Sequence, residues 1–309
     1  RSTLFPYTTL FRSNQRRDRN IITAAKVVMR GAFFFAFPAA FASAFTGAKN
    51  IVSQIASGKP IELNPFISIL TGLLLFTVLF GRFFCGFACS FGTYGDVLYE
   101  ISSRIRKKFK KQPFGFSVKA GLWLRYGKYI CLLALLVLCY IGKEAWIGNI
   151  SPWTAFSRLE ALKIPDPANL AGVIIFAAIS VLMLFEKRFF CRFLCPMGAI
   201  FSIMPILPFS QLGRNRSKCL PKCRQCINVC PANVKITDTT LDEDIDADVS
   251  EIPEQEGDPN MGECFACGKC VDVCPAGNIH SLTVKGGYPG LVWNIAKGAI
   301  LAAVIYFLM

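Results

Sequence analysis

Two cysteine-rich runs decide the fold of this chain: C-L-P-K-C-R-Q-C-I-N-V-C-P at Cys219–Pro231 and C-F-A-C-G-K-C-V-D-V-C-P at Cys264–Pro275. Each run places three cysteines close together and a fourth directly before a proline. Structural zinc sites use pairs of C-x2-C elements, so this spacing matches zinc poorly. Disulfides suit small secreted domains, whereas these runs lie among apolar segments. The spacing therefore predicts sites of thiolate-ligated iron.

The spacing also predicts which cysteines act together. The second run has the C-x2-C-x2-C-x3-C-P spacing of bacterial ferredoxins, and the first run has one extra residue between Cys219 and Cys223. In two-cluster ferredoxins, the fourth cysteine of each run ligates the cluster of the other run. We therefore expect two [4Fe-4S] clusters, held by Cys219, Cys223, Cys226 and Cys274 and by Cys264, Cys267, Cys270 and Cys230.

The composition of the 309 residues indicates a membrane protein. Hydrophobic residues make up 53% of the chain and charged residues 17%, and the mean hydropathy is +0.44. The net charge of +14 fits cytoplasmic loops that face anionic lipid, and no aromatic-interleaved basic motif points to nucleic acid. Fourteen cysteines beside one histidine favour metal bound by sulfur. Because His280 stands alone, the chain cannot supply the two axial ligands of a bis-histidine haem.

Five apolar stretches are predicted to cross the membrane. They lie at Val27–Ala48, Ile67–Gly81, Leu122–Gly142, Leu170–Phe185 and Leu291–Met309. Pro38 is expected to kink the first stretch, and the last either ends at Met309 or continues beyond it. We therefore predict an all-α transmembrane helical bundle with a small α+β two-cluster ferredoxin domain inserted before the fifth span.

This pattern divides the chain into parts. We expect a membrane domain at 14–213, a ferredoxin domain at 214–285 and the fifth span at 286–309. Residues 1–13 resemble the forward translation of a sequencing adapter and are interpreted as an assembly artefact. An acidic insertion at 238–258 separates the two cysteine runs and is expected to be solvated, or to dock a basic partner.

The distribution of Lys and Arg predicts the orientation of the spans. The loop at 82–119 carries eight basic residues and the loop at 187–218 carries six, whereas the two opposite loops carry two and three. We therefore expect a multi-pass protein of a bacterial-type inner (cytoplasmic) membrane. Its amino terminus, its cysteine-bearing loops and its ferredoxin domain are expected on the cytoplasmic side. A reducing compartment suits such thiolate sites.

A short motif is repeated at the ends of the second and fourth stretches: R-F-F-C-G-F-A-C at Arg82–Cys89 and R-F-F-C-R-F-L-C at Arg188–Cys195. The repeat suggests two tandem helix pairs related by a duplication, which would bring together Cys85, Cys89, Cys191 and Cys195. We expect C-x3-C to place both thiols of a motif on one helical face. The four cysteines are interpreted as an additional cluster, another metal site or redox-active thiols, and packing as small apolar side chains is the alternative.

The basic residues near these cysteines allow two interpretations. Arg82 and Arg188 either offset the negative charge of a thiolate site or anchor the helix ends on the positive-inside face. Lys128, in the third stretch, is expected to extend to the membrane interface. The same stretch carries Cys131 and Cys139, which are predicted to be core residues.

The repeated C-x3-C motif, the two ferredoxin runs and the further span together resemble the NapH/NosR-type membrane polyferredoxins over about Val27–Met309. The resemblance implies a membrane electron-transfer protein that connects a quinol pool or a cytoplasmic donor with a redox partner, often flavin-bearing. It also implies that the four repeated cysteines are the membrane cysteine motifs of the family. The family has a proline after the second cysteine of each motif: Pro196 agrees with this pattern, whereas Ser90 departs from it.

The predicted function is the transfer of single electrons through two [4Fe-4S] clusters, between a quinol or cytoplasmic donor and a redox partner. The sequence has no catalytic triad, phosphate-binding glycine loop or flavin-attachment motif. Substrate chemistry is therefore expected to belong to a partner protein, and the chain to be a non-catalytic subunit. Two alternatives stay open: handling of copper or assembly of an oxidoreductase through the membrane cysteines, and redox sensing.

Overall fold

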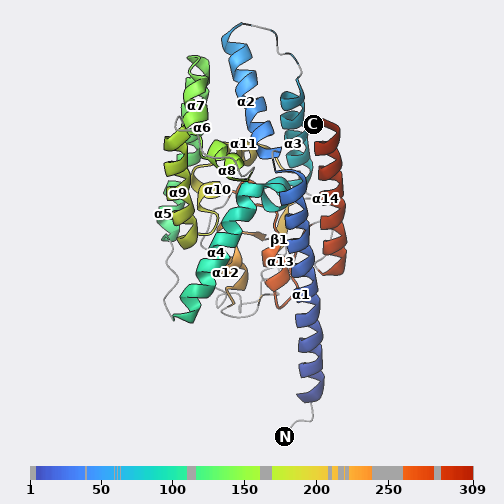
Figure 1. Cartoon of the computed structure of the whole chain (residues 1–309). Helices are drawn as coiled ribbons and strands as arrows, with labels where there is room; N and C mark the ends of the chain where they lie inside the picture. The colour runs from blue at the N-terminus through green and yellow to red at the C-terminus, as the bar shows by residue number, and fades with distance from the viewer. Residues whose placement is uncertain are drawn as a thin grey trace.

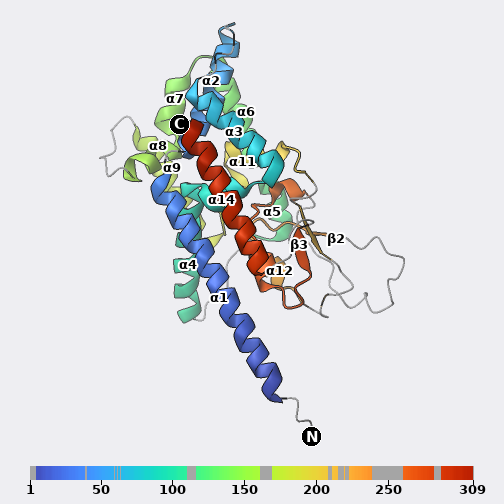
Figure 2. The same cartoon turned by 90° about the vertical axis from the view of Figure 1, so that its right-hand side faces the viewer.

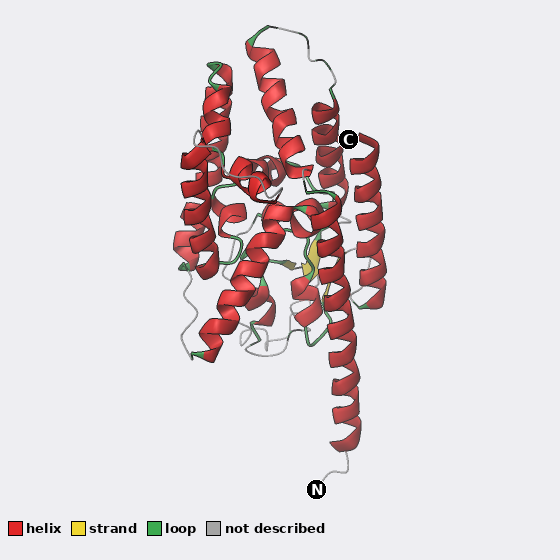
Figure 3. Ribbon diagram, viewed as in Figure 1, coloured by secondary structure: helices red, strands yellow, loops and turns green. Residues whose placement is uncertain are grey.

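The computed structural model describes residues 5–38, 40–58, 60, 62, 64–109, 116–160, 169–207, 211–214, 219, 223–238, 260–281 and 287–308. Helices dominate this part of the chain, and the strands form one small sheet (Figure 3). The sheet and the short helices around it lie in the half of the molecule away from the far ends of α2 (Ala40–Ala56) and α7 (Glu144–Ile150) (Figures 1 and 2). The predicted helical class is therefore confirmed for the described residues.

The first two helices, α1 (Phe5–Ala36) and α2, meet near Pro38 at an angle of 59°. Proline has no N–H to donate to the preceding turn, and its ring clashes with that turn, so a helix breaks there. The Ala40 N–H bonds to the Phe37 carbonyl oxygen at 3.3 Å and starts the next helix. The predicted kink is therefore confirmed, as a break between two helices.

The first helix pair consists of α3 (Pro65–Phe80), the short π-helix η1 (Phe84–Ala88) and α4 (Ser90–Lys108). Asn64 caps α3, because its side-chain oxygen accepts the Ile67 N–H at 2.9 Å. A proline fills the first position of α3, where a missing N–H costs no hydrogen bond. The capped start and the apolar run that follows explain why α3 forms here.

The second helix pair repeats this plan. It consists of α9 (Leu170–Phe185), α10 (Phe189–Phe193) and α11 (Pro196–Ile203). Between the pairs lie α5 (Val118–Leu124), α6 (Gly127–Tyr140), α7 and α8 (Pro152–Glu160). Helix α4 of the first pair packs along α9 of the second, so the two pairs share one core.

The cysteine-rich region folds around a three-stranded sheet. Its elements are β1 (Leu212–Arg214), α12 (Gln225–Val229), β2 (Thr237–Asp238), η6 (Met261–Glu263), α13 (Lys269–Val273) and β3 (Ile279–Ser281). Strand β1 lies in the middle, parallel to β2 and antiparallel to β3. The predicted mixture of helices and strands is present here, while residues 239–258 of the acidic insertion lie outside the described residues.

The last helix, α14 (Tyr288–Leu308), packs against α1 and α3. This helix and the segment Lys119–Tyr140 are long and apolar enough to cross a membrane, and the bent pair of α1 and α2 passes the same test as one unit. Helices α3 and α9 are apolar but have 16 residues each. The described residues therefore contain two candidate spans, or three with the bent pair, and two shorter apolar helices where the other predicted spans lie.

Aromatic rings form the centre of the helical core. Phe83 stacks on Phe87 with ring centroids 4.4 Å apart, and Phe91 lies 4.5 Å from Phe190 of the other helix pair. All four rings are buried, and each such pair adds about 0.5–1.5 kcal/mol beyond the burial of its area. The phenylalanines of the repeated motif therefore surround its cysteines with a dry core that joins the two helix pairs.

Candidate functional site

The two repeated motifs have the same backbone geometry at their second cysteine. The Cys89 N–H bonds to the Phe84 carbonyl oxygen at 2.9 Å, and the Cys195 N–H bonds to the Phe190 carbonyl oxygen at 2.9 Å. The backbone angles φ and ψ are −72° and 114° at Cys89, and −72° and 113° at Cys195. Ser90, which departs from the proline of the family, therefore follows a cysteine whose backbone matches the one before Pro196.

Each C-x3-C motif is followed by a break in the helix at its second cysteine, while the placement of both thiols on one helical face stays a prediction. Cys85 lies inside η1, but Cys89 has an extended ψ and separates η1 from α4. Cys191 lies likewise inside α10, and Cys195 separates α10 from α11. The second cysteine of each motif therefore lies at the N-terminus of the next helix.

These second cysteines receive backbone hydrogen bonds from the helices that follow them. The Gly198 N–H donates to the Sγ of Cys195 at 3.3 Å, and the Gly92 N–H makes the corresponding contact with Cys89. Backbone N–H groups at a helix N-terminus favour negative charge, so both positions stabilise a thiolate. A Cβ at Gly198 would lie 3.0 Å from the guanidinium of Arg82, which shows how closely the opposite motif approaches.

The four membrane cysteines form one electrostatic group. Burial, followed by the thiols of Cys191 and Cys85, raises the pKa of both Cys89 and Cys195 above the ordinary range. Burial also raises the pKa of Cys191 to about 11, against the opposing effect of the Arg188 guanidinium. Buried thiols of this kind stay protonated at neutral pH unless a metal replaces the proton. The structure therefore brings together the four cysteines of the repeat.

Arg188, from the second motif, binds the first motif. Its guanidinium donates to both carboxylate oxygens of Asp96 at 2.9 Å and to the carbonyl oxygens of Cys85 at 2.6 Å and Gly86 at 3.4 Å. Burial by itself would lower the pKa of Arg188, but the Asp96 carboxylate reverses this effect and raises it. Both Arg188 and Arg82 are 1% exposed, so these residues balance charge inside the protein and do not anchor it at a lipid interface.

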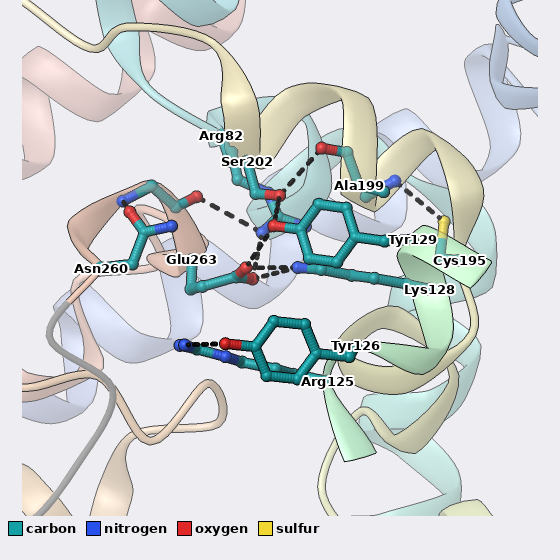
Figure 4. A network of polar contacts seen from close by, with 12 residues as sticks. Arg82, Arg125, Tyr126, Lys128, Tyr129, Cys195, Ala199, Ser202, Asn260 and Glu263 are labelled. Atoms are coloured by element: carbon teal, nitrogen blue, oxygen red, sulfur yellow. Dashed lines mark hydrogen bonds and ion pairs between the residues drawn. The ribbon is translucent and has the colours of Figure 1, made fainter. Parts of the chain in front are cut away.

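Arg82, from the first motif, binds the cysteine-rich region. Its guanidinium donates to Glu263 Oε2 at 3.1 Å (Figure 4). The Lys128 ammonium forms an ion pair with the same carboxylate, and the Tyr129 hydroxyl donates to Glu263 Oε1 at 3.4 Å. Three side chains from the membrane helices and their connections therefore meet at one buried carboxylate, which lies directly before the second cysteine run.

The position of Lys128 overturns the expectation that its side chain extends to the membrane interface. Lys128 is 0% exposed, because its ammonium turns inward to Glu263. An ionisable residue inside an apolar span indicates a paired or functional site, so the sequence carried a signal for Lys128. Sequence reasoning missed Glu263, since nothing in its local sequence distinguishes it from a solvated carboxylate.

The segment after Glu263 inserts between the two motifs. The Phe265 side chain is 2% exposed, and its ring centroid lies 4.9 Å from the Arg82 guanidinium and 5.0 Å from that of Arg188. A Cβ at Gly86 would lie 2.3 Å from the Phe265 carbonyl oxygen and 3.6 Å from the Cα of Cys267, so glycine is required there. The second cysteine run therefore touches the first membrane motif.

The first predicted ligand set draws on both cysteine runs. The Asn278 amide donates to the Sγ of Cys219 at 3.4 Å, and the Cys274 thiol donates to the Asn278 oxygen at 3.0 Å. The thiols of Cys219 and Cys274 also interact with that of Cys226. Cys223, the fourth member, is half-buried and lies two residues before α12. Asn278 thus connects the beginning of one run with the end of the other.

In the second predicted set, Cys267 and Cys270 are buried and Cys230 and Cys264 are half-buried. Burial, followed by the thiols of Cys230 and Cys267, raises the pKa of Cys264 to about 12. Burial, followed by the thiol of Cys264, raises the pKa of Cys270 well above its ordinary value. Cys230 comes from the first run and the other three from the second, which is the pairing that the spacing predicts.

Thiols are the ligand type that iron–sulfur clusters use. Among the described residues, no three His, Cys, Asp or Glu side chains converge tightly enough to hold a single ion. A [4Fe-4S] cluster is larger than one ion, and each of its four thiolates binds a separate iron at its own corner. By donor type, and because the described residues hold no site for a single ion, the cysteines therefore fit iron–sulfur clusters better than a mononuclear metal.

Buried positive charge surrounds the second cysteine run. The Lys26 ammonium bonds to Asp272 at 2.6 Å, and Arg30 bonds to Asp96 at 3.1 Å. The buried cations of the membrane helices and their connections are Lys26, Arg30, Arg82, Lys128, Arg188 and Lys297. The carboxylates that pair with them are Asp96, Glu263 and Asp272. The excess of positive charge suits the negative charge of thiolate-ligated clusters, whose potentials depend on net charge.

Two family models match the chain, and both describe iron–sulfur proteins. A model described as a 4Fe-4S binding domain matches residues 65–111 and 168–207, which include both membrane motifs. A model described as a 4Fe-4S dicluster domain matches residues 211–275, which include both cysteine runs. The matched segments therefore contain every cysteine that the sequence assigns to a cluster.

Curated relatives extend this similarity over most of the chain. An uncharacterised protein of Methanocaldococcus jannaschii is 31% identical over 212 residues, which are 68% of this chain and 69% of the relative. The ferredoxin-type protein NapH of Escherichia coli is 24% identical over 240 residues, 76% of this chain and 73% of that protein. The regulatory protein NosR of Pseudomonas aeruginosa is 29% identical over 156 residues, 50% of this chain and 21% of NosR. No solved structure matches the chain.

Proposed function

Because the chain belongs to the NapH/NosR-type membrane polyferredoxin family, we propose that it carries single electrons through two [4Fe-4S] clusters between a donor and a redox partner. One contact carries this proposal: the second cysteine run rests on the first membrane motif, with the Cα of Cys267 3.6 Å from the place of a Cβ at Gly86. When bound, such clusters each accept and release one electron at a potential that the protein sets. The contact supports an electron path between the two parts of the chain.

The proposed ligands are the cysteines of the two runs. They form the sets Cys219, Cys223, Cys226 and Cys274, and Cys264, Cys267, Cys270 and Cys230. The bridge through Asn278 supports the first set, and the mutual effect of the thiols on their pKa values supports the second. We propose a further metal or cluster site at Cys85, Cys89, Cys191 and Cys195, supported by the burial of the last three and by the matching backbone at the second cysteine of each motif.

The surrounding residues hold and insulate these sites. Arg82 and Arg188 offset the negative charge of ligated thiolates and fix the two motifs against each other. The Gly198 N–H stabilises the Cys195 thiolate through its hydrogen bond at 3.3 Å. The buried phenylalanine rings of the motifs exclude water, which lowers the local dielectric and strengthens these charge interactions.

The proposed arrangement in the membrane has five spans. They are the bent pair of α1 and α2, α3, the segment of α5 and α6, α9 and α14. We propose that the membrane domain at 14–213 and the span at 286–309 enclose a cytoplasmic ferredoxin domain at 214–285. The excess of Lys and Arg in the loops at 82–119 and 187–218 supports this orientation.

A cavity supports a quinol as the electron donor, with a flavin-bearing protein as the proposed partner. The cavity has a volume of about 320 Å³, lies between α2, α7 and α8, and is lined by the aromatic rings of Phe45 and Trp153 and by basic and hydroxyl side chains. The Trp153 ring lies 5.4 Å from that of Phe190, the neighbour of Cys191. We expect Trp153→Leu to slow reduction by a soluble quinol analogue and to leave reduction by dithionite unchanged. Equal rates with the quinol analogue would contradict this site.

The experiment that tests the proposal is anaerobic analysis of iron, sulfide and copper with EPR spectroscopy. We expect about twelve iron atoms per chain in the wild type and about eight in Cys85→Ser/Cys191→Ser, with loss of one distinct signal. The control is Cys131→Ser/Cys139→Ser, which removes one half-buried and one buried cysteine outside the motifs. About eight iron atoms in all proteins would restrict the clusters to the ferredoxin domain, and no iron after reconstitution would refute the proposal.

Copper content separates the proposed function from handling of copper. Four thiols without histidine, three of them buried and that of Cys85 half-buried, are a ligand set that Cu(I) also accepts. Copper that is present in the wild type and lost in Cys85→Ser/Cys191→Ser would support the copper function in place of a third cluster. Copper near zero in both proteins would exclude it at the membrane motifs.

A further inference from the structure

The two repeats differ in the source of the carboxylate that pairs with each buried arginine. Arg188 pairs with Asp96, which lies in α4, the helix that follows the first motif. The corresponding position in α11, the helix that follows the second motif, is Ser202. Arg82 pairs instead with Glu263, which belongs to η6 in the cysteine-rich region. The first repeat therefore supplies a carboxylate, Asp96, from its own helix α4. The second repeat has Ser202 at that position, and Glu263 of the cysteine-rich region supplies the carboxylate instead.

Glu263 lies beside the position that Asp96 occupies in the first repeat. The Ser202 hydroxyl is 2.9 Å from the Tyr129 hydroxyl, which donates to Glu263 Oε1 at 3.4 Å (Figure 4). A Cβ at Gly262 would lie 2.5 Å from the Ser202 carbonyl oxygen, so the loop approaches the backbone of α11 as closely as glycine allows. The loop that contains Gly262 and Glu263 thus places a carboxylate near Ser202, where the second repeat lacks one.

The burial of this arginine makes the added carboxylate necessary. Arg82 is 1% exposed, and a buried guanidinium without a counter-charge is strongly unfavourable. Without a carboxylate near Ser202, Arg82 would therefore destabilise the second half of the core. Lys128 is buried beside it and increases the positive charge at the same point. The Glu263 carboxylate therefore pairs with two buried cations, Arg82 and Lys128. These pairs hold the loop around Glu263 on the membrane helices more firmly than an exposed ion pair would.

We propose that Glu263 is a positioning residue that completes the second repeat and thereby aligns the second cysteine run with the membrane cysteines. Cys264 follows Glu263 directly, Phe265 packs against both arginines, and Cys267 reaches Gly86 two residues later. A carboxylate held by Arg82 thus sets where the ligands of one cluster stand relative to the first motif. The inference goes beyond electron transfer, because it concerns how the cysteine-rich region is positioned relative to the membrane motifs.

The test exchanges the carboxylate between the loop and the helix. We expect Glu263→Gln to accelerate amide hydrogen exchange in the loop at 260–268 by at least about tenfold, and to weaken the magnetic interaction between the clusters in EPR spectra. Ser202→Asp in the wild-type background places a second carboxylate beside Glu263 and should also accelerate exchange. In the Glu263→Gln background the same Ser202→Asp should restore exchange to within about threefold of the wild type, because Arg82 regains a partner from the helix, as Arg188 has in Asp96.

Ser202→Asn is the matched control, since asparagine has the shape of aspartate without its charge. Rescue of Glu263→Gln by Ser202→Asn as well as by Ser202→Asp would overturn the inference, because packing would then explain the effect. Unchanged loop exchange in Glu263→Gln would overturn it as well. Amide exchange reports the loop whether or not clusters are bound, so a protein without iron would refute the proposed function and leave the test of Glu263 intact.

Discussion

Gly86 in the first motif and Arg192 in the second occupy the same place in the repeat, yet they face different surroundings. A Cβ at Gly86 would lie 2.3 Å from the Phe265 carbonyl oxygen, because the second cysteine run rests there. Arg192 pairs instead with Glu186, and its guanidinium lies 4.7 Å from the Phe193 ring. The backbone is alike at the second cysteine of both motifs, while the side chain at this one position decides which motif can receive the cysteine-rich region.

The charges of the two motifs show the same division. Asp96 and Ser202 stand at corresponding positions, and the serine makes room for a carboxylate from another part of the chain. A duplicated frame can therefore hold four thiols in nearly equal geometry and still be joined to the ferredoxin region on one side. The following variants test how far the two motifs are equivalent, from the largest expected effect to the smallest.

Arg188→Met should have the largest effect, because it removes the bidentate partner of Asp96 from the core. We expect the free energy of unfolding, measured by denaturant titration in detergent, to fall by about 3–5 kcal/mol. Arg104→Met is the control: its pair with Glu100 is exposed and should contribute at most about 1 kcal/mol. Equal losses in the two variants would mean that Arg188 does not hold the motifs together.

Gly86→Ala tests whether the first motif is the one that receives the ferredoxin loop. The added Cβ would meet the Phe265 carbonyl oxygen at 2.3 Å, so the loop must shift, and we expect a loss of about 1–3 kcal/mol with altered cluster EPR spectra. Gly148→Ala serves as the control, since a Cβ there meets no described atom within 4 Å. Wild-type stability and spectra in Gly86→Ala would show that the loop does not rest on this motif.

The acid stability of the protein should depend on the internal carboxylate of the first repeat. Burial by itself would raise the pKa of Asp96, but the Arg188 guanidinium lowers it below the usual range. The pair therefore stabilises the fold fully above the pKa of an unfolded aspartate, about 3.9, and loses this contribution as pH falls toward the folded pKa. Asp96→Asn should flatten the acid limb of the stability curve, measured from pH 7 downward, whereas Glu100→Gln should not. Parallel curves for all three proteins would contradict this assignment.

Ser90→Pro should have the smallest effect, a gain of about 0.4–1 kcal/mol in the free energy of unfolding. The preceding Cys89 has the extended backbone that a residue before proline adopts, and Ser90 starts a helix as Pro196 does. The Ser90 hydroxyl is also buried, and the described residues give it no hydrogen-bond partner. Pro196→Ser should cost a similar amount in the second repeat. A loss in Ser90→Pro would mean that the two motifs differ more than their backbones indicate.

Local sequence predicted much of the fold and most of the candidate ligands. The apolar stretches became helices, Pro38 broke the first of them, and the repeated motif produced two helix pairs with a common backbone. The C-x3-C spacing did not predict the break after each motif, where the extended ψ of Cys89 and Cys195 separates a short helix from the next one. The position and the apolar character of helix α3 were predicted correctly, although its 16 residues are fewer than a full membrane span needs.

The sequence by itself determined that the chain carries two ferredoxin-like cysteine runs and a duplicated C-x3-C motif, and it predicted which cysteines act together, because ligand spacing and duplication are short, local patterns. Only the tertiary structure decided which partners these motifs meet. Glu263 bonds to Arg82 across a separation of 181 residues and to Lys128 across 135. Such contacts depend on how helices and loops pack in space, and they leave no periodic pattern or motif in the sequence. Folding alone therefore brings Glu263 to the buried guanidinium of Arg82, where its carboxylate acts as the counter-charge.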